Sequence, residues 1–163
     1  MKDENDPTRS RILIVDDSNV IRSSVKRLLQ PLNSRIVEAN NGQEGLKQAL
    51  ENNFDLIISD VDMPAMNGIE MCRHLKNIEK TRNTPLVIVS SFDSEADIER
   101  GFQVGASAYL SKSEAQERLC EVVQGFLSKA SFNKKRLIMI IDDSPVIRQI
   151  VKEGLEVSRN VCG

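Results

Sequence analysis

Residues 11–31 read RILIVDDSNVIRSSVKRLLQP, a strand pattern that runs directly into a helix pattern. The stretch begins with a short β-branched run, which ends at the acidic pair Asp16 and Asp17. Apolar residues then recur at helical spacing from residue 21 to residue 29, and Pro31 ends the pattern because proline cannot continue a helix. The stretch therefore predicts a buried strand followed by an amphipathic helix.

The same alternation continues along the chain. Further strands are expected at residues 35–39, 54–59, 86–90 and 108–112, each followed by a segment with helical periodicity. Five strand-then-helix units predict an α/β fold, because right-handed crossovers place the helices over both faces of a parallel sheet. We expect a doubly wound, flavodoxin-like sheet with strand order 2-1-3-4-5. Ser113 and Gln116 predict a capping box at the start of the last helix.

Polar residues follow the predicted strands where each one ends. Asp16 and Asp17 end the first strand, Asp60 the third, Ser90 the fourth and Lys112 the fifth. In open parallel sheets, ligands bind at the carboxyl ends of the strands. We therefore expect these five residues to converge on one edge of the sheet.

The three carboxylates predict a cation at that edge. Asp16, Asp17 and Asp60 would repel one another at neutral pH unless a positive charge joined them. Ligands that offer only oxygen favour a hard ion, so Mg²⁺ is expected and Mn²⁺ is the second choice. An ionised Asp60 could then attack a phosphoryl group in line, with Lys112 neutralising the phosphoryl oxygens and Ser90 donating a hydrogen bond.

These residues resemble a known family, the receiver domains of bacterial two-component response regulators, from Arg11 to Lys129. The acidic pair, the D-x-x-M-P-x-M-x-G run at 60–68, the serine thirty positions after Asp60 and the GASAYLSK run at 105–112 occur in the order and spacing of that family.

The resemblance implies a role for each site residue. Asp60 would be the phosphoacceptor, with the backbone carbonyl of Asp62 joining the three carboxylates around the metal. Ser90 and Tyr109 would form the switch, and the side chains of Asp62 and Phe92 would tune the lifetime of the phosphate. Such a domain is not an enzyme beyond its own phosphorylation and dephosphorylation. Its expected partners are a histidine kinase or a histidine phosphotransfer protein, and a homodimer through the fourth helix, fifth strand and fifth helix.

The sequence departs from the common family pattern after Lys112. Many relatives have proline there in a cis peptide bond, whereas this chain has Ser113. A cis bond before serine costs about 2.5–4 kcal/mol, so a trans bond or visible strain is expected.

An internal repeat sets the expected domain organisation. Residues 138–155 match residues 12–29 at 11 of 18 aligned positions, including the acidic pair and the VIR that follows it. One strand and one helix cannot bury a core of their own. We therefore expect a flexible tail at 1–9, a receiver at 10–129, a linker at 130–136, and the start of an incomplete second receiver at 137–163.

A second function class remains open at this point. Asp60 and Asp62, followed by Ser90, Lys112 and the pair Asp142–Asp143, imitate the motif order of metal-dependent phosphohydrolases of the haloacid dehalogenase type. Repeated hydrolysis of a generic phosphoester would favour the hydrolase, whereas a single labelling event would favour the receiver.

Composition excludes other classes. The net charge is −2 and basic residues are interspersed with acidic ones, so no nucleic-acid site is expected in this segment. No apolar stretch approaches the roughly 20 residues that span a bilayer, and the first residues are polar. Three widely spaced cysteines fit a reducing compartment. A cytoplasmic location is expected.

Overall fold

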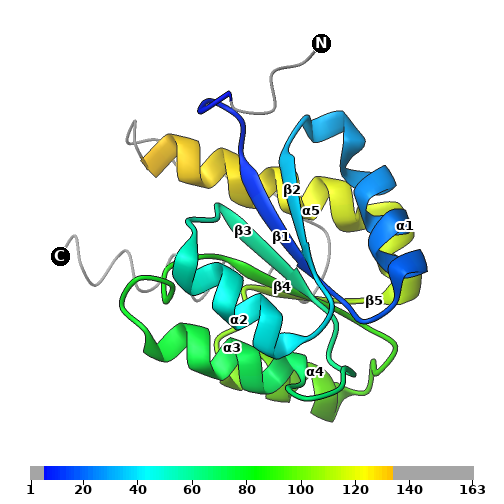
Figure 1. Cartoon of the computed structure of the whole chain (residues 1–163). Helices are drawn as coiled ribbons and strands as arrows, with labels where there is room; N and C mark the ends of the chain where they lie inside the picture. Colours follow the sequence, from blue (N-terminus) through cyan, green and yellow to red (C-terminus); the bar gives the residue numbers. More distant parts are fainter. Residues whose placement is uncertain (1–5, 134–163) are drawn as a thin grey trace, which may run out of the picture.

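The apolar runs form the strands of a single parallel sheet (Figure 1). The computed structural model describes residues 6–133. The strands are β1 (Arg11–Val15), β2 (Arg35–Ala39), β3 (Leu56–Ser59), β4 (Leu86–Ser90) and β5 (Ala108–Ser111). The helices are α1 (Asn19–Leu29), α2 (Gly42–Glu51), α3 (Gly68–Asn77), α4 (Glu95–Gln103) and α5 (Lys112–Asn133), and a short 3₁₀ helix, η1 (Gln30–Leu32), contains Pro31.

The strand order is β2-β1-β3-β4-β5, which confirms the predicted doubly wound topology. Strand register sets the arrangement of the site. Val15 pairs with Ala39 on one side and with Ser59 on the other. Asp16 and Asp60 each follow one of these paired residues, so the two carboxylates emerge side by side at the carboxyl edge.

Helices cover both faces of the sheet, as Figure 1 shows. On one face α1 and α5 pack on alternate residues of the strands, including Ile14 and Ile58. On the other face α2, α3 and α4 cover the intervening residues, including Leu13 and Ile57. Burying both faces explains why β3 and β4 are buried throughout and consist of unbroken apolar runs that end in a serine, rather than alternating apolar and polar residues.

The capping box of α5 corrects a sequence-based prediction. Its members are Ser111 and Glu114, not Ser113 and Gln116. Ser111 Oγ accepts from the Glu114 N–H at 3.2 Å, and Glu114 Oε2 accepts from the Ser111 N–H at 2.9 Å. The helix begins as soon as β5 ends, without a loop, so the cap lies two residues earlier. A carboxylate in the first turn also interacts better with the helix dipole than a neutral amide does.

Two boundary expectations can be compared with the structure. None of the peptide bonds in residues 6–133 is cis, which confirms the trans bond between Lys112 and Ser113. The helix α5 continues to Asn133, four residues past the expected domain end at 129 and into the expected linker. The repeat at 138–155 lies outside the described residues.

Within residues 6–133, no helix is both long and apolar enough to cross a membrane. Cys72 and Cys120 in this range are free thiols.

The capping box predicts a contrast between two serines. Replacing Ser111 with alanine removes the acceptor for the Glu114 N–H and should lower the free energy of unfolding by about 1 kcal/mol. Replacing Ser113, which is exposed and whose hydroxyl is hydrogen-bonded to that of Ser111 alone among residues 6–133, should cost less than about half of that. Urea unfolding of both variants measures the difference. A larger loss for Ser113→Ala would restore the original assignment of the cap.

Candidate functional site

Three carboxylates gather at the carboxyl edge of the sheet, as the sequence predicts. Asp16 and Asp17 follow β1, and Asp60 follows β3. Each can offer one oxygen such that the three oxygens lie within 4.8 Å of one another. Asp16 and Asp60 are buried and Asp17 is exposed, so the cluster opens to solvent on one side. Three oxygen donors with an open side fit a hard divalent cation that keeps part of its water shell.

Burial raises the pKa of Asp16 above its ordinary value. The charges of Asp60 and Asp17 act in the same direction, whereas the Ser18 N–H, which donates to Asp16 Oδ1 at 2.8 Å, and the Lys112 ammonium oppose the shift. Without a cation the ionised cluster is therefore electrostatically unfavourable.

Asp60 and Lys112 form an ion pair. Lys112 Nζ lies 3.3 Å from Asp60 Oδ2, and the other oxygen, Oδ1, accepts from the Val61 N–H at 2.7 Å. Burial raises the pKa of Asp60, while Lys112 and the backbone hydrogen bonds from Val61 and Asp62 lower it. The lysine thus favours the ionised carboxylate, which is the form that can act as a nucleophile.

A chain of hydrogen bonds joins β4 to β5 through Phe92. The Phe92 N–H donates to Ser90 Oγ at 3.1 Å, and the Phe92 carbonyl accepts from the Tyr109 hydroxyl. Tyr109 is buried and its ring lies against Gly101 of α4, where an added Cβ would come within 2.7 Å of the ring. Burial is the main reason that the pKa of Tyr109 is raised. The Phe92 side chain is 48% exposed, so its main chain makes this connection.

The turn at 60–68 brings α3 against the phosphoacceptor candidate. Gly68 opens α3, and a Cβ at this position would lie 1.9 Å from the Asp60 carbonyl oxygen, which is impossible. Glycine is therefore required by this close approach. The Asp62 side chain in the same turn is exposed. The capping box of α3, formed by Asn67 and Glu70, was not predicted from the sequence.

Sequence reasoning also missed Arg22. This buried residue of α1 donates from Nη1 to the main-chain carbonyl of Asp16 at 2.7 Å. The signal that could have found it was present, because the internal repeat pairs Arg22 with Arg148, six residues after Asp142 as Arg22 is after Asp16.

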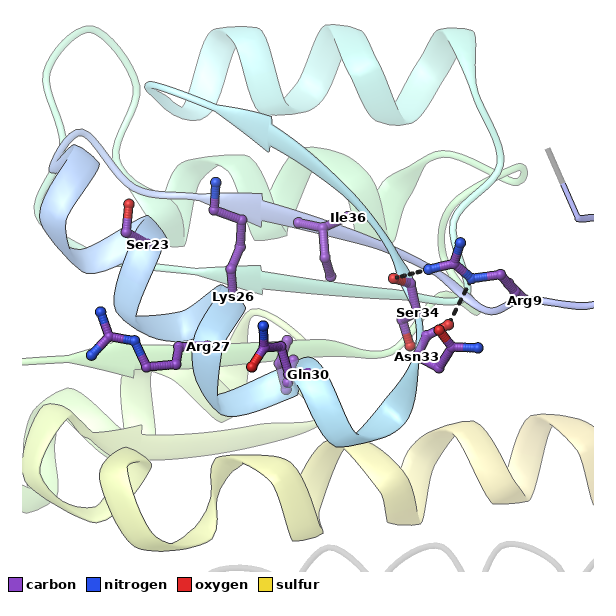
Figure 2. A pocket seen from close by; sticks show the side chains of 9 residues that line it. Arg9, Ser23, Lys26, Arg27, Gln30, Asn33, Ser34 and Ile36 are labelled. Carbon is purple, nitrogen blue, oxygen red and sulfur yellow. Dashed lines mark hydrogen bonds between the residues drawn. The ribbon is translucent and has the colours of Figure 1, made fainter. Parts of the chain in front are cut away.

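A separate open groove of about 490 Å³ lies between α1 and β2 (Figure 2). Its lining contains no carboxylate, and the basic side chains of Arg9, Lys26 and Arg27 extend in different directions. The groove is therefore distinct from the acidic edge.

Comparison with known proteins agrees with the geometry. Residues 12–124 match the response regulator receiver domain family. The chain is 39% identical over 106 residues to the gliding motility regulatory protein of Myxococcus xanthus, covering 65% of this chain and 14% of that protein. It is 30% identical over 119 residues to the polar-differentiation response regulator DivK of Brucella anthropi, covering 73% of this chain and 97% of that protein.

The fold has close counterparts among solved structures. The chemotaxis response regulator CheY4 of Vibrio cholerae superposes with a TM-score of 0.68 at 34% identity, covering 73% of this chain and 99% of that one. These similarities support a phosphoacceptor signalling domain and not the phosphohydrolase of the haloacid dehalogenase type. The chain spans only a small part of the gliding motility protein, so that protein's overall activity does not carry over to it.

The raised pKa of Asp16 predicts a stability effect with a definite sign. The folded-state pKa of Asp16 lies above the ordinary value of 3.8. The folded state therefore loses stability as pH rises from 3.8 through the folded-state pKa, because the carboxyl ionises less easily in the fold than in the unfolded chain. With divalent ions removed by EDTA, Asp16→Asn should be more stable than the parent at pH 7. The advantage should shrink as pH falls and vanish below 3.8.

Lys112→Met provides the control for this measurement. It removes the cation that favours the ionised cluster, so it should be less stable than the parent at pH 7. Thermal unfolding at several pH values follows both variants. Equal stability of Asp16→Asn and the parent at pH 7 would show that burial does not disfavour the charged carboxyl.

Proposed function

Because the chain belongs to the response regulator receiver domain family, we propose that Asp60 accepts a phosphoryl group from a phosphohistidine donor in a Mg²⁺-dependent reaction. The observation that carries the proposal is the placement of Asp60, with two further carboxylates beside it and Lys112 at 3.3 Å. In the reaction an Asp60 oxygen bonds to phosphorus as the phosphorus–nitrogen bond of the donor breaks. The imidazole keeps that electron pair and takes up a proton.

Asp16, Asp17 and Asp60 would hold the cation, together with the backbone carbonyl of Asp62. All four donors are oxygens, which suits Mg²⁺ and also Mn²⁺. The ion would supply charge neutralisation and a template for the phosphoryl oxygens. Water attack on the phosphorus would later release phosphate and restore the carboxylate.

Lys112 and Ser90 would bind the phosphoryl oxygens. Lys112 already contacts Asp60, and its ammonium offers three donors to a newly arrived dianion. Ser90 lies at the carboxyl end of β4, beside β3 in the sheet. Its hydroxyl accepts from the Phe92 N–H and still has its own hydrogen to donate to the phosphoryl group, and a movement of the hydroxyl toward that group would lengthen or break the bond to Phe92.

This movement suggests how the switch operates. The Ser90 hydroxyl and the Tyr109 hydroxyl share Phe92 as a main-chain partner, and Tyr109 packs on α4 at Gly101. Movement of Ser90 would therefore alter the surface of α4, β5 and α5 through a population shift between two packings. The side chains of Asp62 and Phe92 are exposed and lie two residues after Asp60 and Ser90, and we infer that they set the lifetime of the phosphoryl group.

Receiver domains interact with histidine kinases or histidine phosphotransfer proteins, and we infer that one of these donates to Asp60. The surface of α4, β5 and α5 would serve a homodimer formed after phosphorylation, and no nucleic-acid contact is proposed for this segment. Sedimentation velocity with and without acetyl phosphate tests the dimer.

We further infer that residues 10–129 are the functional receiver and that residues 137–163 are the beginning of a second one. The support is the repeat, whose acidic pair, Asp142 and Asp143, matches Asp16 and Asp17.

Intact-mass measurement after incubation with acetyl phosphate and Mg²⁺ tests the phosphoacceptor. The parent should gain one phosphoryl group and Asp60→Asn none. Lys112→Ala should keep the labelling site but slow labelling on the order of 100-fold, since it removes the positively charged hydrogen-bond donor proposed to bind the phosphoryl oxygens.

Two controls accompany the mass experiment. EDTA should abolish labelling of the parent. Ser113→Ala, an exposed neighbour of Lys112, should be labelled as the parent is. Labelling of Asp60→Asn to the same extent as the parent would remove Asp60 as the acceptor.

A further inference from the structure

Arg22 joins three separate elements of the site. Its Nη1 donates to the Asp16 carbonyl at 2.7 Å, and its Nε donates to Glu38 Oε1 of β2 at 3.1 Å. Its Nη2 lies 3.4 Å from Asn19 Oδ1, at the start of α1. Only 11% of the side chain is exposed. A buried guanidinium with this many partners stabilises one arrangement of the strand end.

Asp16 is held at three points by its neighbours. Its N–H donates to the Ala39 carbonyl at 3.2 Å, its carbonyl accepts from Arg22, and its Oδ1 accepts from the Ser18 N–H. Within residues 6–133 no hydrogen bond is made by Oδ2. That oxygen remains available to a cation, in a direction set by the three contacts.

Glu38 keeps the guanidinium in place. It pairs with Ile14 in the sheet register and accepts from Lys26 Nζ at 2.9 Å as well as from Arg22. These hydrogen bonds, with that of Lys26 the stronger, hold the pKa of Glu38 below its usual value. Lys26 itself lines the groove of Figure 2 and forms no hydrogen bond or ion pair with Asp16 within the described residues.

We propose that Arg22 is a positioning residue for cation binding, which fixes the direction of the Asp16 carboxylate by tying the Asp16 carbonyl to Glu38. This inference rests on the proposed Mg²⁺-dependent function. Arg22 contacts the main chain of Asp16 and not its carboxylate, so it acts through geometry. Residues that orient metal ligands in this way commonly change metal affinity by 10–100-fold when they are replaced.

The internal repeat supports this role independently. Along with Asp142 and Asp143, it retains Ser144, Arg148 and Lys152 at the positions of Ser18, Arg22 and Lys26. By contrast, the exposed Asn19, Ser23 and Arg27 are replaced in the repeat by Pro145, Gln149 and Glu153. Among the polar residues at 12–29, the ones retained at 138–155 are therefore the acidic pair itself and the residues that contact this pair or Glu38.

Isothermal titration of the full chain with Mg²⁺ tests the proposal. Arg22→Met should weaken Mg²⁺ binding about ten-fold. Lys26→Met is the matched control. Like Arg22→Met, it removes a positively charged side chain of α1 that binds Glu38, but it leaves the hydrogen bond to the Asp16 carbonyl untouched. It should bind Mg²⁺ within about two-fold of the parent. At saturating Mg²⁺, both variants should still be labelled at Asp60 by acetyl phosphate.

Arg22→Lys gives a second measurement, which also applies if Arg22→Met does not fold. A lysine keeps the charge and the apolar stem but lacks the planar fork, so it cannot hold the Asp16 carbonyl and Glu38 together. Its Mg²⁺ affinity should fall by at least about three-fold. Parent-like affinity in folded Arg22→Met or Arg22→Lys, or an equal loss in Lys26→Met, would overturn the role of Arg22.

The proposed function fails separately from this inference. A parent that neither binds Mg²⁺ nor gains a phosphoryl group would remove both. A parent that does both, beside an Arg22→Met variant with unchanged affinity, would remove only the positioning role.

Discussion

Like-charge repulsion among three carboxylates is the constraint around which this domain is organised. Asp16 and Asp60 are taken largely out of water, and burial disfavours the ionised form of both, while the charges of Asp60 and Asp17 further disfavour that of Asp16. The fold opposes this with Lys112, which follows the edge strand β5, with backbone N–H groups and with an arginine that anchors the main chain of Asp16. Binding of a cation would lower the electrostatic free energy of this edge of the sheet. The bound cation would in turn favour the binding of a dianionic phosphoryl group.

The sheet supplies the accuracy that such a site needs. Because Val15 is in register with Ser59, the two carboxylates that follow them differ little in height along the strands. Main-chain hydrogen bonds set this register, so the relative position of the two strand ends is fixed by the backbone, before any side chain contributes. Gly68 contributes in another way, since its lack of a side chain lets α3 approach the main chain of Asp60.

Much of this arrangement could be predicted because it follows from short sequence patterns within single strands and helices. Apolar runs such as LVIVS at 86–90 predicted buried strands. The polar residues that end these runs, including Asp60 and Ser90, predicted a site at the carboxyl edge of the sheet. The contacts that were missed cross between elements. Arg22 looks like a surface arginine on an amphipathic helix, and only the packing of α1 on β2 brings it to Asp16 and Glu38. The cap of α5 was misplaced because two serines lie close together, and the length of β5 decides between them.

The connection through Phe92 separates two properties at a single residue. Its amide and carbonyl contact the hydroxyls of Ser90 and Tyr109, whereas its ring faces solvent near the reactive edge. Any amino acid with a free N–H can make the same pair of main-chain bonds. A substitution at this position can therefore change the exposed side chain, for which we propose a role in the lifetime of the phosphoryl group, without removing the two main-chain hydrogen bonds.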